Sequence, residues 1–225
     1  ICPTYNRPHY LLRAIYIFFK QDYPNKELII VDDSDKLLIS KIPKMNNVTY
    51  IKLKSREILG TKRNIAVKHA RGDIFIFWDD DDIYSTKRIS KQVMPIIDSK
   101  ADITLFNNIV YHELCSDTYF KTSQKDHLFL WYKGYICGTM ASKKSFWLKD
   151  SFKKKSLGED REYVERALIN GARVKALKNY NDFIYTRHGD NTYLFGNVKK
   201  IKIPHTKIPR SLKKGFYNIN TFTSR

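Results

Sequence analysis

Short apolar runs that end in clusters of aspartate dominate the first hundred residues. Residues 27–31 end at the acidic cluster 32–35, and the most hydrophobic run, 74–78, leads directly into four aspartates at 79–82. A short, continuous apolar run is typical of a strand buried on both faces, as in parallel sheets. Stretches with helical spacing of apolar residues separate these runs. The pattern therefore predicts a parallel, doubly wound α/β sheet.

The remaining elements are less regular toward the end of the chain. Residues 1–3 look like the end of a strand. Further strands are expected at 48–53, 102–111, 174–177 and 183–185, and helices at 8–21, 60–70, 86–99, 126–133 and after Gly158. In doubly wound sheets, ligands bind beyond the carboxyl ends of the strands. The polar segments 3–7, 32–35 and 79–82 should therefore converge on one cleft.

Length and composition narrow the possible classes of protein. The chain has 225 residues, 42% of them hydrophobic and 14% aromatic, enough for a core and unlike a disordered or collagen-like chain. No apolar run approaches the roughly 18 residues that span a bilayer, and no cleavable leader is evident, which favours a soluble or peripheral protein. Three scattered cysteines without CxxC spacing argue against a disulfide framework and a structural zinc, so a reducing, cytoplasmic setting is expected.

Positive charge is concentrated at the end of the chain. With 41 Lys and Arg against 23 Asp and Glu, the formal net charge is +18. Residues 196–225 contain eight Lys or Arg, no Asp or Glu and no helical period, which predicts a basic tail or surface arm. Peripheral attachment to an anionic membrane is one expectation for such an arm. Nucleic acid is a less favoured partner, because no helix-turn-helix, zinc-finger, RNP or KH signature accompanies the charge.

The four consecutive aspartates need a compensating charge, because carboxylates this close raise one another's pKa and destabilise a fold. A hard divalent cation such as Mg²⁺ or Mn²⁺ takes carboxylate oxygens and is commonly completed by substrate phosphates and water. A solvated acidic turn is the alternative. The position directly after a buried strand that ends in Trp78 favours the metal.

Five short motifs stand in order along the chain: 3–7 (PTYNR), 30–34 (IVDDS), 60–64 (GTKRN), 72–82 (GDIFIFWDDDD) and 158–160 (GED). Together they resemble the inverting nucleotide-sugar glycosyltransferases of family 2, which have the GT-A fold. The resemblance covers residues 1 to about 190. It implies a Rossmann-like, mostly parallel, doubly wound α/β sheet with a smaller mixed region on the acceptor side. The expected division is a GT-A domain at 1–195, with a nucleotide-binding half at 1–110 and an acceptor half at 111–195, followed by the basic arm at 196–225.

The resemblance also implies which residues contact the nucleotide sugar. The matching positions are Pro3, Thr4, Tyr5, Arg7, Asp33, Arg63, Asp79 and Asp80. The turn at 3–5 looks like the segment that lines the base pocket, and Asp33 is similar to the aspartate that hydrogen-bonds the base. Arg63 matches the basic residue of the family's Arg-Asn pair near the nucleotide.

A metal site follows from the same resemblance. The carboxylates at 79–81 look like the family's DxD element, in which Asp81 would ligate Mn²⁺ or Mg²⁺ while the preceding ones hold the ribose or the metal's waters. His188 resembles a histidine that completes the metal site or touches the diphosphate, with Arg187 as a further phosphate partner; a structural histidine is the alternative. The candidate metal ligands are Asp81, Asp79 and His188.

Asp160 is similar to the family's catalytic base. A plain carboxylate at a helix N-terminus, favoured by the helix dipole, is the alternative, and Glu159 is the rival base. Residues 137–140 resemble the segment that lines the sugar and acceptor side, or form a tight turn between buried elements. Trp131 and Tyr132 could stack on a sugar or belong to the core.

These assignments predict a metal-dependent, inverting transfer from a nucleoside diphosphate sugar, most simply a UDP-sugar, to a hydroxyl of a glycan, a lipid-linked saccharide or a protein. The metal would stabilise the departing diphosphate, and a carboxylate would take the acceptor proton in a single inverting displacement. The QxxRW motif of processive synthases is absent after Asp160, which favours a single-addition enzyme.

Two alternatives remain. A nucleotidyltransferase of nucleotide-sugar synthesis should carry a glycine-rich phosphate loop after the first strand, where this chain has Thr4 to Arg7. A non-catalytic basic module that binds nucleic acid or a membrane would leave the four aspartates unexplained.

Overall fold

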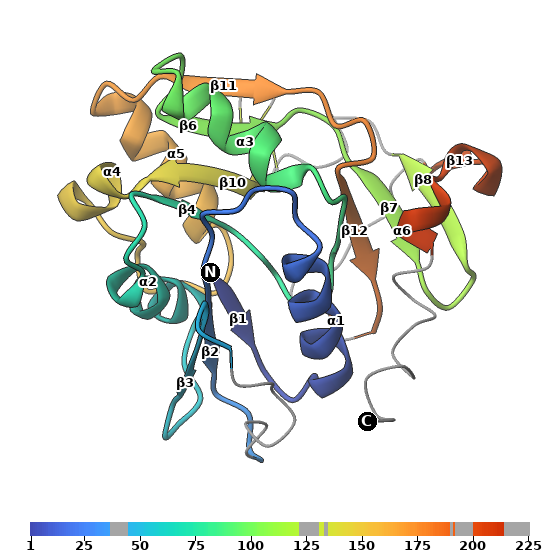
Figure 1. Ribbon diagram of the computed structural model, residues 1–225, viewed down its shortest axis with the longest axis horizontal. Helices are drawn as coiled ribbons and strands as arrows, with labels where there is room; N and C mark the ends of the chain where they lie inside the picture. The colour runs from blue at the N-terminus through green and yellow to red at the C-terminus, as the bar shows by residue number, and fades with distance from the viewer. Residues whose placement is uncertain (37–44, 122–130, 133–134, 190, 192–199, 214–225) are drawn as a thin grey trace.

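Three parallel strands begin the fold. The computed structural model describes residues 1–36, 45–121, 131–132, 135–189, 191 and 200–213 (Figure 1). Strand β1 (Cys2–Thr4) pairs with β2 (Leu28–Asp32), and β2 pairs with β3 (Val48–Lys52), both in parallel. Helices α1 (Pro8–Phe19) and α2 (Leu59–His69) follow β1 and β3. Pro8 opens α1, where the missing N–H of proline costs nothing.

A second set of strands extends this sheet beyond β1. The Ile1 amino group donates to Ile76 O (2.7 Å) and Trp78 N–H donates to Ile1 O (3.0 Å), the two bonds of a parallel pair centred on Phe77. Strand β4 (Ile74–Ile76) therefore lies beside β1 and continues to β10 (Tyr135–Lys143), β6 (Ile103–Phe106) and β11 (Val174–Leu177). Along this path β10 runs against its neighbours and the other strands share one direction.

The order β3-β2-β1-β4 reverses at β1, because the chain first adds strands on one side of β1 and then returns to the other. Such a reversal opens a crevice at the carboxyl ends of the two central strands. Here those ends lead to Thr4 and Asp79. The predicted convergence of the polar segments is thus built into the strand order.

Helices cover both faces of the sheet, as a doubly wound fold requires, and α1 and α2 lie on opposite sides of β1–β3 (Figure 1). The alternation along β2 divides the core in two. Leu28 and Ile30 join the cluster that contains α1 and α3 (Arg88–Ile97), whereas Ile29 and Val31 join the cluster that contains α2 and α5 (Glu159–Ile169). All four side chains are buried, which explains the continuous apolar run in the sequence.

A third, mixed sheet stands beside the first two. It contains β13 (Ile201–Ile203), β8 (Thr118–Lys121), β7 (Val110–Glu113), β12 (Phe183–Arg187) and β5 (Ile83–Tyr84), in that order. After β13 come a 3₁₀ turn, η3 (His205–Lys207), and α6 (Arg210–Lys213), and Ile208 and Leu212 are buried in the cluster with α1 and α3. The described part of the predicted basic arm therefore lies on the fold.

The single strand expected at 102–111 is wrong. The structure divides it into β6 and β7, which belong to different sheets. Between them, the Asn108 side chain donates to Asn179 O (3.0 Å) and accepts from Asn179 N–H (2.8 Å). Side chains of this kind compete with the strand ladder for backbone partners, and here they interrupt it.

The prediction of a helix at 126–133 is wrong for residues 131–132, the part of this range that the structure describes. Residues 126–130 and 133 lie outside the described residues, and 131–132 form β9 (Trp131–Tyr132), which pairs with β10. Aromatic residues suit a strand that lies against another strand, and this preference outweighs a short helical pattern. The other predicted elements are present with shifts of a few residues. The sequence pattern did not predict α4 (Lys144–Lys149), β5, β8, β13 or α6.

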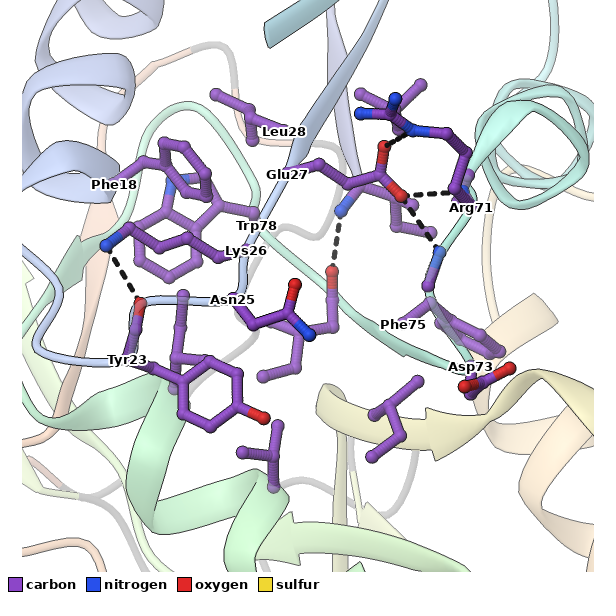
Figure 2. Close-up of a pocket in the computed structure, with 18 of the residues that line it drawn as sticks. Phe18, Tyr23, Asn25, Lys26, Glu27, Leu28, Arg71, Asp73, Phe75 and Trp78 are labelled. Atoms are coloured by element: carbon purple, nitrogen blue, oxygen red, sulfur yellow. Dashed lines mark hydrogen bonds and ion pairs between the residues drawn. The ribbon is translucent and has the colours of Figure 1, made fainter. Parts of the chain in front are cut away.

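A cavity of about 470 Å³ lies at the opposite edge of the sheet, near the amino ends of β2 and β4 (Figure 2). Its walls include Phe18, Trp78 and Phe75, and Glu27 accepts the backbone N–H groups of Arg71 (2.6 Å) and Gly72 (2.9 Å) at its rim. It is distinct from the crevice at the carboxyl ends. Among the described helices, none is both long and apolar enough to cross a bilayer.

Candidate active site

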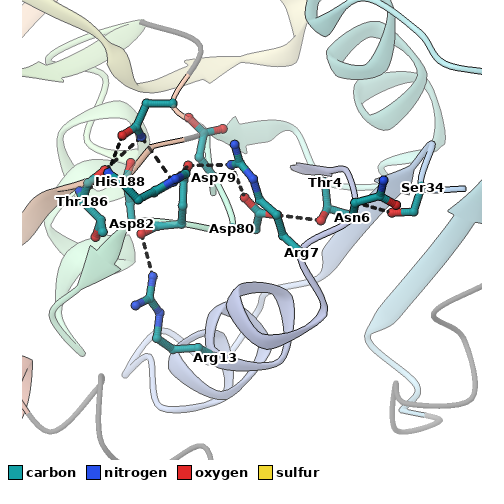
Figure 3. A network of polar contacts seen from close by, with 12 residues as sticks. Thr4, Asn6, Arg7, Arg13, Ser34, Asp79, Asp80, Asp82, Thr186 and His188 are labelled. Atoms are coloured by element: carbon teal, nitrogen blue, oxygen red, sulfur yellow. Dashed lines mark hydrogen bonds and ion pairs between the residues drawn. The ribbon is translucent and has the colours of Figure 1, made fainter. Parts of the chain in front are cut away.

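Side-chain hydrogen bonds join the ends of β1 and β2 to the aspartate turn 79–82 that follows β4 (Figure 3). Thr4 Oγ1 donates to Asp80 Oδ2 (2.5 Å), which joins β1 to the aspartate turn. Asn6 N–H donates to Ser34 Oγ (2.6 Å), which joins β1 to β2. Asn6 has a φ of 52°, a left-handed conformation that asparagine tolerates better than most residues. The three polar segments predicted from the sequence are therefore neighbours.

The four aspartates at 79–82 face different partners. Arg7 lies 2.7 Å from Asp81 Oδ2 and 3.4 Å from Asp80 Oδ1, so one guanidinium serves two of the carboxylates. Asp82 accepts the backbone N–H of Thr186 on β12 (3.0 Å), and Asp79 faces Arg63 at 3.6 Å. Tyr84 OH also donates to Asp79 O (2.9 Å). The carboxylates are thus paired with partners from three separate segments of the chain.

These surroundings divide the carboxylates into two classes. Burial raises the pKa of Asp80 to about 7, reinforced by Asp81 and opposed by Arg7. Burial also raises the pKa of Asp79 and, more strongly, that of Asp82. Burial alone would raise the pKa of Asp81 too, but His188 and Arg7 hold it below its ordinary value. Asp81 is therefore the carboxylate of the turn that most favours negative charge.

His188 is brought to Asp81 from the far end of the chain. Its Nε2 lies 3.0 Å from Asp81 Oδ2, and its ring stacks on Tyr10 of α1 at 5.2 Å. The His188 N–H donates to Asn191 Oδ1 (2.6 Å), and Asn191 Nδ2 donates to Thr186 O (3.0 Å). A side-chain turn after β12 thus fixes the imidazole beside Asp81.

The donor set at Asp81 and His188 suits a divalent cation that shares its coordination with substrate. Within the described ranges, no three Asp, Glu, His or Cys side chains are grouped as a closed metal cage. Mg²⁺ commonly binds through one or two protein carboxylates together with phosphate oxygens and water, and Mn²⁺ accepts similar oxygen ligands. Asp79 Oδ1 is buried and has no hydrogen-bond partner in the described structure, but it does not join Asp81 and His188 in a group of three ligands. The residues therefore fit the metal, with Arg7 on the same Asp81 oxygen.

Asp33 is held from several sides at the end of β2. Lys62 Nζ donates to Asp33 Oδ1 (2.8 Å) and to Thr4 O (3.1 Å), and Glu57 N–H donates to Asp33 Oδ2 (2.8 Å). Pro3 precedes this point inside β1, paired with Val31. A buried lysine therefore locks the ends of two strands together. The sequence contained Lys62 within the GTKRN motif, but nothing in its residue type predicted this partner.

Tyr5 lies at the rim of the same region. The guanidinium of the exposed Arg56 sits 3.2 Å from the centre of the Tyr5 ring, and Tyr5 OH donates to Asp35 Oδ2 (3.2 Å). The guanidinium covers one face of the ring through a cation–π contact. This is the predicted position of the base pocket.

Asp160 is the second residue of helix α5 and faces β10. Gly158 precedes the helix with a φ of 77°, which a residue with a side chain adopts only with strain. A Cβ placed on Gly138 of β10 would lie 3.5 Å from Asp160 Oδ2, so the carboxylate rests directly against the 137–140 segment. Burial raises the pKa of Asp160, and Arg63 opposes the shift. A carboxylate whose pKa is raised in this way accepts a proton more readily than an ordinary aspartate.

Arg63 lies between the two carboxylate groups. Its Nε is 3.2 Å from Glu159 Oε1, and its guanidinium carbon stands 3.4 Å above the Phe77 ring. Arg63 is 3% exposed and Glu159 is 2% exposed. Burial raises the pKa of Glu159 to about 7, with Arg63 opposing. Glu159, the rival base, is therefore buried and paired with Arg63, whereas Asp160 is only half-buried and more accessible to a substrate.

Several residues of the crevice were missed by the sequence. Arg13 NH2 donates to Asp81 O (2.6 Å), and Glu113 lies 3.4 Å from Arg187 Nε and 2.7 Å from Lys200 Nζ. For Arg13, the sequence signal was an arginine among the apolar positions of the predicted helix. For Glu113, no local sequence pattern indicated its two partners. Trp131 and Tyr132 fall in β9, and their side chains lie outside the described structure.

Comparison with known proteins relates this arrangement to one family. The profile described as "Glycosyl transferase family 2" matches residues 1–155. The poly(ribitol-phosphate) β-N-acetylglucosaminyltransferase TarS of Staphylococcus aureus is 33% identical over 105 residues, 44% of this chain and 18% of TarS. The chain spans less than half the length of the curated relatives it matches.

Solved structures agree on the fold. S. aureus TarS 1–349 in complex with UDP superimposes with a TM-score of 0.67 at 22% identity, covering 83% of this chain and 59% of that one. The mannosyltransferase PcManGT from Pyrobaculum calidifontis, in complex with GDP-Man and Mn²⁺, gives a TM-score of 0.62 at 15% identity, covering 83% of this chain and 55% of that one. The architecture described above is the GT-A type of α/β fold.

Proposed function

The chain belongs to glycosyl transferase family 2, and from this premise we propose that it is a metal-dependent, inverting glycosyltransferase that uses a nucleoside diphosphate sugar. One observation carries the proposal. Arg63 lies between Asp79 of the aspartate turn and Glu159, the residue before Asp160. The aspartate turn and the first turn of α5, which carries Asp160, thus meet at one guanidinium, and transfer needs a diphosphate site and a base close together.

The proposed step is a single displacement. The acceptor hydroxyl gives its proton to the Asp160 carboxylate, its oxygen forms the bond to the anomeric carbon, and the bond from that carbon to the diphosphate oxygen breaks. Attack opposite to the leaving group inverts the anomeric centre. The nucleoside diphosphate departs with the bonding electron pair. General-base assistance of this kind contributes about 10²- to 10⁴-fold to the rate.

The leaving group needs positive charge, since two phosphates accumulate charge as the bond breaks. A bound Mn²⁺ or Mg²⁺ would supply Lewis-acid stabilisation there, held by Asp81 and His188 with Asp79 nearby. Arg63 NH1 is buried and has no hydrogen-bond partner among the described residues, so it can donate to a ligand oxygen. Asp80 and Asp79 are the proposed ribose or water partners.

We propose UDP as the carrier and a single sugar per acceptor. The TarS structure is a UDP complex, which supports UDP as the carrier. The Tyr5 ring and Asp33 are the proposed contacts of the base, and Arg7 is the proposed contact of the first phosphate. The acceptor hydroxyl belongs to a glycan, a lipid-linked saccharide or a protein. Single addition is part of the proposal, and it is supported by the lack of a QxxRW motif between Asp160 and Arg225.

Calorimetry with UDP, GDP, CDP and dTDP, each with Mn²⁺ and with EDTA, tests the proposal. We expect UDP to bind with a Kd at least about tenfold lower in Mn²⁺ than in EDTA, equivalent to about 1.4 kcal/mol. The other nucleotides should bind more weakly. Equal affinity for all four, or no effect of Mn²⁺ on folded protein, would contradict the proposed donor and metal.

The described basic segment motivates one proposal about location. Lys202, Lys207 and Arg210 are exposed on the segment that carries β13, η3 and α6. We propose that they attract an anionic membrane bearing the acceptor, at about 1 kcal/mol per charge near the surface. Vesicles containing phosphatidylserine should co-sediment the protein, and replacing all three by Gln should reduce binding at least tenfold. Binding that is equal for both proteins removes the idea.

A further inference from the structure

The side chain of Asn64 points away from the nucleotide side of the crevice. Its Oδ1 accepts from Trp147 Nε1 (2.8 Å) and from Phe152 N–H (3.0 Å), and its Nδ2 donates to Phe152 O (2.8 Å). Trp147 and Phe152 belong to the segment that precedes α5. Asn64, although it neighbours Arg63 in α2, is thus bonded to the chain that leads into Asp160.

The same segment is pressed against the start of α2. Gly60 N–H donates to Lys155 O (2.9 Å), and a Cβ on Gly60 would lie 2.1 Å from Lys153 O. No side chain fits at that distance, so glycine is required by the close approach of two backbones. The segment 150–158 therefore rests on α2 without an intervening side chain at this point.

A third contact is made by Arg63 itself. It meets Glu159 at 3.2 Å on α5 and Asp79 at 3.6 Å in the aspartate turn. Going along α2, residues 60, 63 and 64 thus contact residues 155, 159 and 152. The first turns of α2 therefore contact both the segment before α5 and the first residue of α5, on either side of Gly158 in the sequence.

We propose that Asn64 and Glu159 are positioning residues that fix Asp160 relative to the nucleotide site, Asn64 through the 147–152 segment and Glu159 through Arg63. The inference rests on the proposed function, since it needs Asp160 as the base. Precise placement matters because a base must reach the acceptor hydroxyl at hydrogen-bond distance. A misplacement of about 1 Å can cost on the order of 10²-fold in rate.

The variant Asn64→Ala tests the first contact. We expect kcat to fall about 10- to 100-fold while the Kd of UDP with Mn²⁺ stays within twofold, because the nucleotide side is untouched. Trp147→Phe is the matched control, since it removes one of the hydrogen bonds to Asn64 and leaves those to Phe152; kcat should fall less than threefold. A UDP affinity that falls as far as kcat, or an unchanged kcat in Asn64→Ala, overturns the proposal.

The variant Glu159→Gln tests the second contact and separates it from the base. It keeps the shape but removes the charge that faces Arg63, so both kcat and UDP affinity should fall, each by about 3- to 30-fold. Combining it with Asn64→Ala should lower kcat by less than the product of the single effects, because both act on the same placement. A strictly multiplicative loss would show that the two residues act independently and would refute the shared role.

A failure of the proposed function is distinguishable from a failure of this inference. If wild-type protein turns over no nucleotide sugar, the proposed function falls, and hydrogen exchange then tests the positioning. Asn64→Ala should speed exchange of the backbone amides of α5 at least tenfold and leave those of β1 and β2 unchanged. Exchange in α5 that matches wild type would overturn the inference whatever the activity.

Discussion

The two sides of the crevice are built in different ways. On the donor side, Thr4, Asp33 and Asp79 each follow a strand of the parallel sheet within a residue or a few, so the strand order alone brings them together. On the other side, His188 reaches Asp81 from a position 107 residues later in the chain, at the end of a strand of the mixed sheet. On the donor side, each residue is placed by the strand that it ends or follows. The position of His188, in contrast, depends on how β12 pairs with strands that are distant in the sequence.

The support beneath each side differs accordingly. Strand β12, which ends just before His188, pairs with β7 and β5, and Glu113 of β7 faces both Arg187 and Lys200. The segment that follows buries Ile208 and Leu212 beneath this sheet. Changes at the donor side should therefore alter binding or chemistry directly, and changes in the mixed sheet should first alter stability. The predictions below test this difference, starting from the largest effect.

Asp160→Asn should lower kcat by at least about 10³-fold and leave the Kd of UDP within twofold. Asparagine keeps the shape but cannot accept the proton, so the loss belongs to the chemical step. Steady-state kinetics with a UDP-sugar and calorimetry with UDP provide the two numbers. Glu162→Gln, a charge change on the exposed side of the same helix, is the control and should stay within twofold. A tenfold or smaller loss in Asp160→Asn would show that another group is the base.

The pH profile extends this prediction. A base must be deprotonated, and burial raises the pKa of Asp160 above the usual aspartate value, so kcat/KM should fall as pH drops through a point above about 4. Asp160 contributes to the raised pKa of Glu159, so the two neighbouring carboxylates titrate together and the acidic limb belongs to the pair. In Glu159→Gln the limb should move to lower pH, since a negative neighbour is gone. A limb that does not move would separate the two titrations.

The donor side was predictable because its chemistry sits next to its strands. The apolar run at 28–31 and the aspartates at 79–82 placed the strand ends and the acidic turn from composition alone. The split of 102–111 into two strands was not predictable, since it depends on hydrogen bonds between Asn108 and Asn179, 71 residues apart. Likewise, no periodicity in 200–213 announced that Ile208 and Leu212 pack against α1 and α3.

Roles were harder to predict than positions. Asn64 was grouped with Arg63 near the nucleotide, but the structure directs it to Phe152, because helical neighbours point in directions about 100° apart. Glu159 and Asp160, adjacent in sequence, likewise separate into a buried partner of Arg63 and a half-buried carboxylate. A motif fixes residue types, whereas the direction of each side chain depends on packing between distant segments.

Asp81→Ala and His188→Ala each remove one partner of the contact that joins the donor side to the mixed sheet, and their effects on UDP binding can be compared. We expect Asp81→Ala to weaken Mn²⁺-dependent UDP binding about 30- to 100-fold, and His188→Ala about tenfold, because a carboxylate supplies charge as well as a ligand. Titration of each variant with UDP in Mn²⁺ and in EDTA separates the metal-dependent part. His9→Ala, an exposed histidine on α1, should leave both values unchanged. Equal losses in Mn²⁺ and in EDTA would argue that neither residue holds the metal.

Leu212→Ala should lower the free energy of unfolding by about 2 to 3 kcal/mol, the usual effect of truncating a buried leucine. The side chain is 3% exposed and belongs to the cluster with α1 and α3. Urea denaturation measures the change, and Ile201→Ala, at a residue 57% exposed, should cost less than about 1 kcal/mol. UDP affinity of the folded Leu212→Ala protein should remain within twofold. A loss below 0.5 kcal/mol would mean that the segment does not stabilise the domain.

The smallest effect is expected at Asp102, before β6 and far from the crevice. Its carboxylate accepts from Arg173 Nε (2.9 Å) and Lys143 Nζ (2.8 Å), and these partners, Arg173 above all, hold its pKa well below the usual range. A depressed folded-state pKa stabilises the fold above the unfolded value of about 3.9, and this stabilisation is lost as pH falls toward the folded value. Asp102→Asn should therefore cost about 1 kcal/mol at pH 7.

That cost should shrink steadily below pH 4, because acid protonates Asp102 first in the unfolded chain, which favours unfolding of the wild-type protein and removes the advantage of the ionised folded form. Denaturation of both proteins at pH 7, 4 and 2.5 measures the difference. Asp98→Asn, at a more exposed carboxylate paired with Lys100, should cost less than about 0.5 kcal/mol at every pH. A difference that stays constant down to pH 2.5 would mean that shape, and not charge, is what Asp102 contributes. In that case, Asp102 would stabilise the fold through its hydrogen bonds and packing, and its negative charge would contribute little.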